Sequence, residues 1–270
     1  GYSRYIRIND IWSKVSKIPK PLRGLVAVFL RMFPATSWDK FNQRFLTKLG
    51  ISNLGYKMHK AAKIITAESI AVFYNDMVSH SYAPEQLVLN TKEPETVFTC
   101  SERKFDIDSG IEEMMALDTV SYLPNDILTK IDRASMGVSL EGRIPFLSHD
   151  VVEFAWALPL NYKFREGEAK WCLKEVLYRY VPKSLVDRPK KGFGVPIGAW
   201  LRGPLREWAS LLLDDARLRS EGIFDPELVS AMWEEHISET HDWQGKLWDI
   251  LMFQAWYEKN HKFDNASTIK

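Results

Sequence analysis

The chain has 270 residues, of which 46% are apolar and 26% are charged, and its formal net charge is +1. This composition is typical of a globular protein, and the small net charge excludes a global attraction to nucleic acid or acidic lipid, so any basic site must be local. The two cysteines, Cys100 and Cys172, are too few for a disulfide framework and favour a reducing, cytoplasmic compartment.

Sequence patterns typical of membrane spans, nucleic-acid sites and metal sites are missing. The longest apolar run, residues 24–30, is shorter than the ~20 residues that a spanning helix needs. No run combines basic and aromatic side chains strongly enough to predict RNA binding. His236 and His241 would lie about 140° apart on a helix, so they do not form a metal pair. We therefore expect no membrane, no nucleic acid and no protein-bound metal.

Helical patterns separated by breaks with proline or glycine run along the whole chain. They predict helices over residues 38–49, 59–67, 111–123, 126–140, 151–158, 168–181, 226–239 and 247–257, with an irregular loop over 183–196. Only 87–89 and 97–100 resemble strands. Residues 247–257 are apolar on nearly every side, so we expect that helix to be buried. The predicted fold class is therefore mainly α.

The pattern divides the chain into three stretches. Residues 1–105 are a helical segment with basic and aromatic connections and no assigned role, residues 106–260 carry the chemical motifs, and residues 261–270 resemble a frayed tail. Because the chain begins at Gly1 and not at methionine, we expect it to be part of a longer polypeptide.

The predicted helix 126–140 separates charged from apolar residues. At about 100° per residue, one stripe and the position that follows the helix carry Asp126, Lys130, Arg133, Gly137 and Glu141. The other stripe consists of Ile127, Ile131, Ala134 and Val138, which we expect to face the core. A glycine within the charged stripe leaves room for a ligand or a second backbone. The alternative is a solvated face laced by ion pairs such as Asp126–Lys130.

Glu141 and Arg143 follow that helix, with Gly142 as its predicted C-terminal stop. A carboxylate at the negative end of a helix dipole is disfavoured unless a cation compensates it, and Arg143 is near enough to do so. A glutamate in that setting is suited to proton transfer.

Residues 188–194 concentrate Arg188, Lys190 and Lys191 with Gly192 and Gly194 in one short segment. The glycines leave backbone N–H groups able to approach an anion, and the lysines are suited to hold phosphate or pyrophosphate. The alternative is an exposed loop whose lysines serve solubility.

The strings YLPNDILTKIDRASM (122–136) and SLEGRIPFL (139–147) together resemble a characteristic run of the asparagine synthetase family. Lys170-Trp171, RPKKGF (188–193), Pro196 and Trp200-Leu201 recur in that family's order, and GYSRY (1–5) resembles the segment after its nucleotide-binding core. The resemblance implies a multi-helix C-terminal portion of an adenine-nucleotide α-hydrolase-like (ATP pyrophosphatase) synthetase domain. The parallel-sheet nucleotide-binding part of that domain is not in the sequence.

The resemblance also implies a reaction and roles for residues. ATP with Mg²⁺ adenylates a carboxylate, by default aspartate, and ammonia derived from glutamine attacks the acyl-adenylate, which makes the protein an AMP-forming amide ligase. Glu141 matches a glutamate that handles protons or orients the amine, and Lys190 matches a lysine that contacts phosphate. The further nucleotide contacts implied are Lys191, Gly192 and Arg143, with Asp126, Lys130, Asp132 and Arg133 behind them.

The sequence also departs from the family. Ser148 stands where the family often has aspartate, and there is no Ser-Gly-Gly-x-Asp-Ser loop, nor any Gly-Gly pair. We therefore expect the chain to be inactive alone and to need an N-terminal glutaminase and an ATP-loop segment as partners. Two alternatives stay open, a non-catalytic helical scaffold and an amidotransferase for a sugar-linked carboxylate in polysaccharide synthesis. Assembly as a homodimer is open as well.

Overall fold

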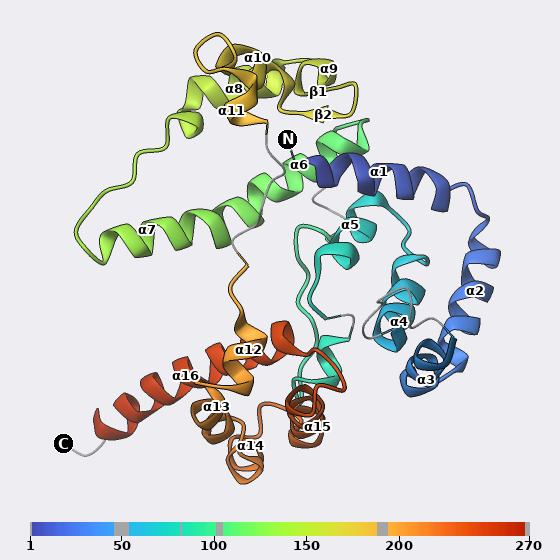
Figure 1. Ribbon diagram of the computed structural model, residues 1–270, viewed down its shortest axis with the longest axis vertical. Helices are drawn as coiled ribbons and strands as arrows, with labels where there is room; N and C mark the ends of the chain where they lie inside the picture. Colours follow the sequence, from blue (N-terminus) through green and yellow to red (C-terminus); the bar gives the residue numbers. More distant parts are fainter. Residues whose placement is uncertain (1, 46–53, 82, 101–104, 188–193, 268–270) are drawn as a thin grey trace. The chain divides into compact units, whose positions relative to one another are not determined.

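The computed structural model describes residues 2–45, 54–81, 83–100, 105–187 and 194–267 (Figure 1). The described residues are mainly helical, with one antiparallel pair of two-residue strands, so the predicted mainly α class is confirmed. The chain forms two compact units that alternate along the sequence. Unit 1 comprises Gly1–Gly24, Ile64–Met77 and Glu95–Lys191, and unit 2 comprises Leu25–Lys63, Val78–Pro94 and Gly192–Lys270.

Unit 1 is built around three helices, α1 (Ser3–Val15), α5 (Ile70–Val78) and α6 (Gly110–Val120). Its further elements are η3 (Leu123–Leu128), α7 (Thr129–Met136), η4 (Pro145–Leu147), α8 (His149–Ala157), α9 (Leu160–Lys163), β1 (Phe164–Arg165), β2 (Glu168–Ala169), α10 (Trp171–Leu177) and α11 (Lys183–Val186). Its apolar cluster includes Tyr5, Ile8, Phe73, Met114 and Leu117, which come from those three helices.

A continuous helical rod in unit 1 leads to the candidate site. Ser109 caps the start of α6 by accepting a hydrogen bond from the backbone N–H of Glu112. After α6 the chain becomes the π-helix η3 and then α7, and Figure 1 shows α6 and α7 as successive parts of one rod. The hydroxyl of Thr129 donates to the carbonyl oxygen of Pro124 at 2.8 Å across this change of helix type. Short π-helical segments inside helices are frequent at functional sites.

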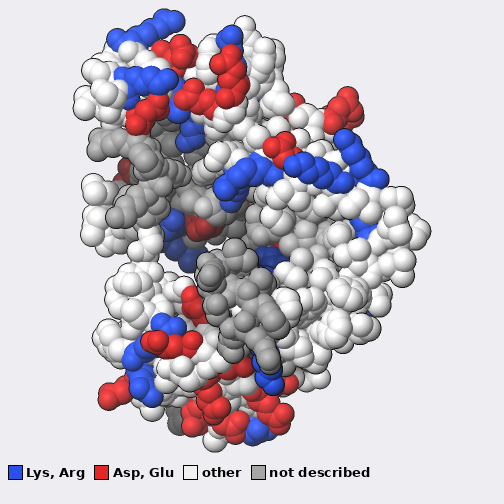
Figure 2. Space-filling model, turned by 45° about the vertical axis from the view of Figure 1, so that its right-hand side comes forward, with Lys and Arg blue, Asp and Glu red and all other residues white. Residues whose placement is uncertain are grey.

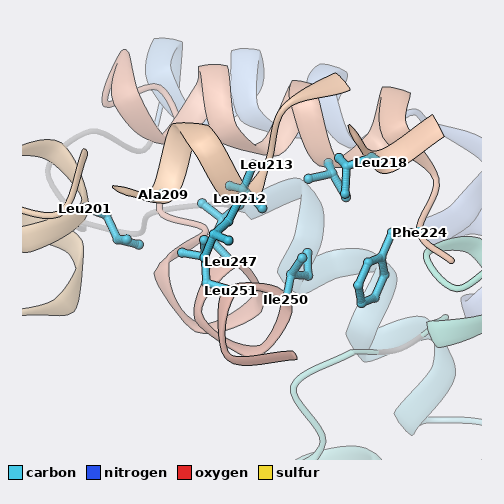
Figure 3. Packing of buried hydrophobic residues seen from close by; sticks show 10 residues of the cluster. Leu201, Ala209, Leu212, Leu213, Leu218, Phe224, Leu247, Ile250 and Leu251 are labelled. Atoms are coloured by element: carbon cyan, nitrogen blue, oxygen red, sulfur yellow. The ribbon is translucent and has the colours of Figure 1, made fainter. Parts of the chain in front are cut away.

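Unit 2 contains the largest apolar core (Figure 3). Its elements are α3 (Ala35–Phe45), α4 (Leu54–Ile64), η2 (Pro84–Gln86), α12 (Ile197–Arg202), α13 (Arg206–Leu212), α14 (Asp215–Glu221), α15 (Pro226–Ile237) and α16 (Gln244–Ser267), and α2 (Lys20–Met32) enters it from unit 1. Leu201 of α12, Leu212 of α13, and Leu247 and Leu251 of α16 belong to one buried cluster. Each leucine is at most 3% exposed, so these helices are held together by apolar burial.

Several predicted helices are present with shifted boundaries. Residues 59–67, 111–123, 151–158 and 226–239 correspond to α4, α6, α8 and α15, and 38–49 corresponds to α3, beyond which residues 46–53 lie outside the described residues. Asp225 caps α15, as its position before Pro226 indicates, by accepting from the backbone N–H of Leu228 at 2.9 Å.

The helix predicted over 126–140 is wrong at both ends. It begins inside η3, and α7 ends at Met136. Ser139 adopts a left-handed φ of 59°, and the backbone N–H of Leu140 donates to the carbonyl oxygen of Ser135. This six-to-one bond is a Schellman ending, and its left-handed residue, Ser139, lies three residues before the predicted stop at Gly142. The sequence did not indicate it because serine is uncommon in that conformation.

The prediction over 168–181 missed a hairpin. Glu166 and Gly167 both have positive φ, which is the backbone of a two-residue turn, and they join β1 to β2. Lys170, also left-handed, ends β2, so α10 begins only at Trp171 and ends at Leu177. The strand predicted over 97–100 is a turn, and in 87–89 only Val88 forms an isolated bridge, with Phe224.

Helix α16 departs from its predicted burial. Leu247, Ile250 and Leu251 are buried, whereas Met252 and Trp256 are 40% and 58% exposed, so the helix is not buried on every side. It extends to Ser267, beyond the point at which the tail was expected to begin. The domain limits at residues 105 and 260 stay predictions, and the two units each combine residues from both sides of residue 105.

Candidate active site

The charged residues predicted from the sequence lie along η3, α7 and the segment that follows them. Asp126 is on η3, Lys130 and Arg133 are on α7, and all three are exposed. Glu141 lies beyond the end of α7, so the predicted stripe does not continue to it as one helical face. Gly137 caps the helix instead of lying within it, and a Cβ there would stand 3.2 Å from the carbonyl oxygen of Arg133. Gly137 therefore lies at the helix end and not in the middle of a charged stripe.

Glu141 and Arg143 form the ion pair that the sequence indicated. The Nε atom of Arg143 lies 3.0 Å from Oε1 of Glu141, and Nη2 donates to Oε2 at 3.1 Å. The two contacts fix the plane of the carboxylate. The side chains of Glu141 and Arg143 are nevertheless 68% and 83% exposed. An ion pair so open to water contributes ~1 kcal/mol or less to stability, so this carboxylate is oriented and accessible.

The apolar stripe of α7 does not face a core in the described structure. Ile131 is 40% exposed, Val138 is 70% exposed, and Ala134 is exposed as well. The core position predicted for these residues is therefore wrong. Sequence periodicity shows that a helix has an apolar side but does not specify what covers it.

A cavity of about 360 Å³ opens next to this segment. Its lining residues are Pro124, Leu128, Thr129, Ile131, Asp132, Gly142 and Ile144. Asp132, which the helical wheel placed away from Glu141, is the only acidic residue in this lining, and Gly142 is the chain neighbour of Glu141. The volume is in the range of small-molecule sites. Within the described ranges, no three His, Cys, Asp or Glu side chains come close enough to hold a metal ion.

The buried carboxylate of Asp118 organises the base of this rod. Its carboxylate accepts hydrogen bonds from the hydroxyls of Tyr5 and Tyr74 and forms an ion pair with Arg4. Helices α1, α5 and α6 therefore meet at this carboxylate. Burial, and then Asp118, raise the pKa of Tyr5 and of Tyr74, which keeps both hydroxyls as donors. The guanidinium of Arg4 also lies 5.1 Å from the ring centroid of Tyr122, directly before η3.

Sequence reasoning missed this network. Asp118 had no signal beyond its place in an amphipathic helix, and its partners lie 44 to 114 residues away in the chain. Arg4 and Tyr5 were noted only as part of the opening GYSRY string.

The basic segment predicted to hold phosphate lies outside the described residues. This applies to Arg188, Lys190, Lys191 and Gly192, so a cleft shared with Glu141 stays a prediction. The chain just before it is well anchored, because Asp187 accepts a hydrogen bond from the Tyr178 hydroxyl at 2.9 Å.

Two lysines complete this anchor. Nζ of Lys174 lies 3.4 Å and Nζ of Lys183 lies 3.6 Å from the Asp187 carboxylate, and Lys174 also pairs with Glu168. The hydrogen bond from Tyr178 and the contacts with Lys174 lower the pKa of Asp187. The described structure therefore holds the chain in place up to the residue that precedes Arg188.

Comparison with known proteins decides the family. The asparagine synthase family profile matches residues 1–258, which include the charged helix, Glu141 and the basic segment. The chain belongs to the asparagine synthase family. Asparagine synthetase [glutamine-hydrolyzing] 1 of Bacillus subtilis is 31% identical over 152 residues, which are 56% of this chain and 24% of that protein.

Other relatives agree with this assignment. A putative asparagine synthetase [glutamine-hydrolyzing] of Mycobacterium tuberculosis (H37Rv) is 36% identical over 148 residues, or 54% of this chain and 22% of that protein. Amidase chyE of Penicillium rubens is 30% identical over 119 residues, which are 40% of this chain and 17% of that protein. The matches with the two synthetases thus span about a quarter of the length of each. No solved structure matches the chain.

The helical structure described above contains Glu141, Arg143, Asp126, Lys130, Asp132 and Arg133 of the predicted site residues. Among the residues that the structure describes, no helix has the length and apolar character that crossing a membrane requires.

Proposed function

We propose that the chain forms one wall of the synthetase site of an amide-forming ligase that uses ATP and glutamine. In this reaction a substrate carboxylate, aspartate by default, attacks the α-phosphate of ATP, and pyrophosphate leaves. Ammonia derived from glutamine then attacks the acyl-adenylate, and AMP leaves as the amide forms. The family match over residues 1–258 carries the proposal, because it contains both Glu141 and Lys190.

Glu141 is the proposed group for orienting the incoming amine and accepting its proton. Its carboxylate is accessible, and Arg143 holds it in one plane through two contacts, as a proton acceptor at a reacting centre requires. Arg143 is also the described cation nearest to that carboxylate, so an incoming anion can share it. The neighbouring cavity with Asp132 and Thr129 is the proposed space for part of the substrate.

Lys190, with Lys191 and Gly192, is proposed to bind the phosphate groups of ATP. Negative charge grows on these oxygens as pyrophosphate leaves, and a lysine placed there stabilises it. Mg²⁺ is proposed to accompany ATP as part of the nucleotide substrate. Lys130 and Arg133 lie on the exposed side of α7 and are assigned to the surroundings of the site.

The test uses the full-length natural protein and measures pyrophosphate release and amide formation separately. Lys190→Ala should lower pyrophosphate release about 100-fold. Glu141→Gln should lower the rate of amide formation about 100-fold. It should lower the rate of pyrophosphate release, which reports adenylation, by less. Glu153→Gln is the matched control, because Glu153 is also 68% exposed and its carboxylate also lies beside a basic side chain, that of His149. Pyrophosphate release that persists in Lys190→Ala would contradict the role of that lysine.

ATP–pyrophosphate exchange by the full-length natural protein distinguishes this proposal from the two alternative functions. A helical scaffold without chemistry predicts no ATP–pyrophosphate exchange with any carboxylate. A sugar-linked carboxylate in place of aspartate predicts exchange that depends on the sugar acid and is indifferent to aspartate. Exchange dependent on aspartate supports the default substrate.

A further inference from the structure

A network of polar side chains joins α10 to the end of α11. Lys174 on α10 and Tyr178 at its C-terminal cap are four residues apart, so they lie on the same side of that helix. The Tyr178 hydroxyl donates to Oδ1 of Asp187 at 2.9 Å, and Nζ of Lys174 lies 3.4 Å from the same oxygen. Nζ of Lys183, the first residue of α11, lies 3.6 Å from Oδ2. Both oxygens of the Asp187 carboxylate therefore have partners.

The hairpin before α10 holds Lys174 in this network. Glu168 lies on β2, which is paired with β1, and its carboxylate forms an ion pair with Lys174. The hydrogen bond with Glu168 raises the pKa of Lys174, so that lysine stays charged beside Asp187. Lys170 has a left-handed φ of 62° between β2 and α10, a conformation that is uncommon for a residue with a side chain. This sharp turn lets Glu168 and Asp187 contact one lysine.

The main chain at Asp187 is held as well as its side chain. The backbone N–H of Asp187 donates to the carbonyl oxygen of Lys183 at 2.8 Å. Nζ of Lys183 also lies 5.4 Å from the centroid of the Tyr178 ring. The side chains of Lys174 and Asp187 are only 29% and 33% exposed. Several partly shielded charges acting together are more effective than an isolated surface ion pair.

Charges of both signs gather in this part of unit 1. Figure 2 shows Lys and Arg beside Asp and Glu at the top of the view, where Figure 1 draws α8, α10 and α11. Asp187 directly precedes Arg188, the first cation of the basic segment over residues 188–193. A carboxylate at that point would compete with a phosphate group for the cations that follow it. Lys174 and Lys183 occupy the carboxylate and offset its charge.

We infer that Asp187 is a positioning residue for the basic segment, an inference that rests on the proposed role of Lys190 in binding the phosphate groups of ATP. Lys190 is three residues beyond Asp187, so covalent geometry limits the distance between their Cα atoms to about 11 Å. A misplacement of about 1 Å can lower a rate as much as 100-fold. Anchoring Asp187 shortens the stretch of chain that has to be ordered when a nucleoside triphosphate binds, which lowers the entropic cost of binding.

The experiment measures pyrophosphate release by the full-length natural protein at a series of ATP concentrations. Asp187→Ala should raise the KM for ATP about 10-fold and change kcat less than about 2-fold, because the cost of ordering the segment is added to binding. Tyr178→Phe leaves every charge in place but removes one hydrogen bond, and it should raise KM about 3-fold. Asp187→Asn keeps an oxygen that can accept from Tyr178 and should therefore be less impaired than Asp187→Ala.

The matched control is Asp215→Ala. This change removes the carboxylate of an exposed ion pair with Arg219 in unit 2, and it should leave the KM for ATP unaltered. Lys190→Ala in the same assay separates the positioning role from the proposed function. Unaltered kinetics in Lys190→Ala would contradict the proposed role of that lysine, and the positioning role would fall with it.

Three results would overturn the positioning role alone while Lys190→Ala is impaired. The first is an Asp187→Ala variant that behaves like the control. The second is a lower KM in Asp187→Ala, because the carboxylate would then act only as an anion that competes with phosphate. The third is a fall in kcat and in the midpoint of thermal unfolding with an unaltered KM, because Asp187 would then support the fold in general.

Discussion

Unit 1 and unit 2 are stabilised in different ways. In unit 2, leucines from several helices are buried in one apolar cluster. In unit 1, the apolar cluster is joined by the Asp118 network, and between Thr129 and Asp187 the only buried residue is Lys163, which pairs with Glu112 at 2.9 Å. Glu141, Arg143 and Asp132 lie in this stretch of unit 1. These described candidate side chains are therefore in the stretch with the least apolar burial, where they are open to solvent.

The largest expected effect tests the polar centre of unit 1. Asp118→Ala should lower the free energy of unfolding by about 4 kcal/mol, because it leaves Arg4 and two tyrosine hydroxyls without their shared acceptor. Chemical denaturation measures the loss, and hydrogen exchange should locate it in α1, α5 and α6. Asp215→Ala, which breaks an exposed pair with Arg219, is the control and should cost less than ~0.5 kcal/mol. Similar losses in both variants would contradict the central role of Asp118.

The next effect tests the apolar core of unit 2. Leu251→Ala should cost about 3 kcal/mol, since the side chain is fully buried and its removal leaves a cavity. Leu140→Ala in unit 1 makes the same chemical change at a side chain that is 63% exposed and should cost less than ~0.5 kcal/mol. Thermal unfolding of both variants compares the two regions directly. If Leu140→Ala were as costly as Leu251→Ala, the contrast in burial between them would be wrong.

A smaller effect separates chemistry from stability in unit 1. Glu141→Gln should change the free energy of unfolding by less than ~0.5 kcal/mol, because it weakens only an exposed ion pair. Its effect on amide formation should be far larger, as proposed above. Stability and activity falling together would show instead that Glu141 supports the fold.

The smallest expected effects are changes of stability with pH, which occur over different pH ranges in the two units. Burial, and then Arg202, lower the pKa of His236 in unit 2 below its ordinary value of 6.5, so the unfolded chain binds the proton more strongly. The stability from neutral His236 is therefore present above pH 6.5 and is lost as the pH falls below it. The pKa of Asp187 in unit 1 is lowered from 3.8, so its contribution is present above 3.8 and disappears only in stronger acid.

Hydrogen exchange at a series of pH values distinguishes these two windows. Protection of α15 and α12 should decline between about pH 7 and 5 and lose this dependence in His236→Gln. Protection around α10 and α11 should stay constant over that range. A decline of both regions in the same window would contradict the assignment.

Sequence patterns determined the features that depend on neighbouring residues in the chain. The mainly α class, the cap of α15 by Asp225 and the pairing of Glu141 with Arg143 follow from spacing, propensity and charge over a few residues. The string from 122 to 147 was sufficient to indicate the family that the comparison confirmed. The Schellman ending at Ser139 was missed because its signal, a left-handed serine, is weak.

The tertiary structure alone decided what covers each apolar face and which polar groups meet across long separations. Asp118 gained partners from two distant helices, the stripe of Ile131 and Val138 proved exposed, and Asp132 proved to line the cavity. The contacts of Asp187 with Tyr178 and Lys174 likewise became visible only in the folded chain. The physical reason is that periodicity fixes which side of a helix is apolar, whereas burial depends on partners that the local sequence does not specify.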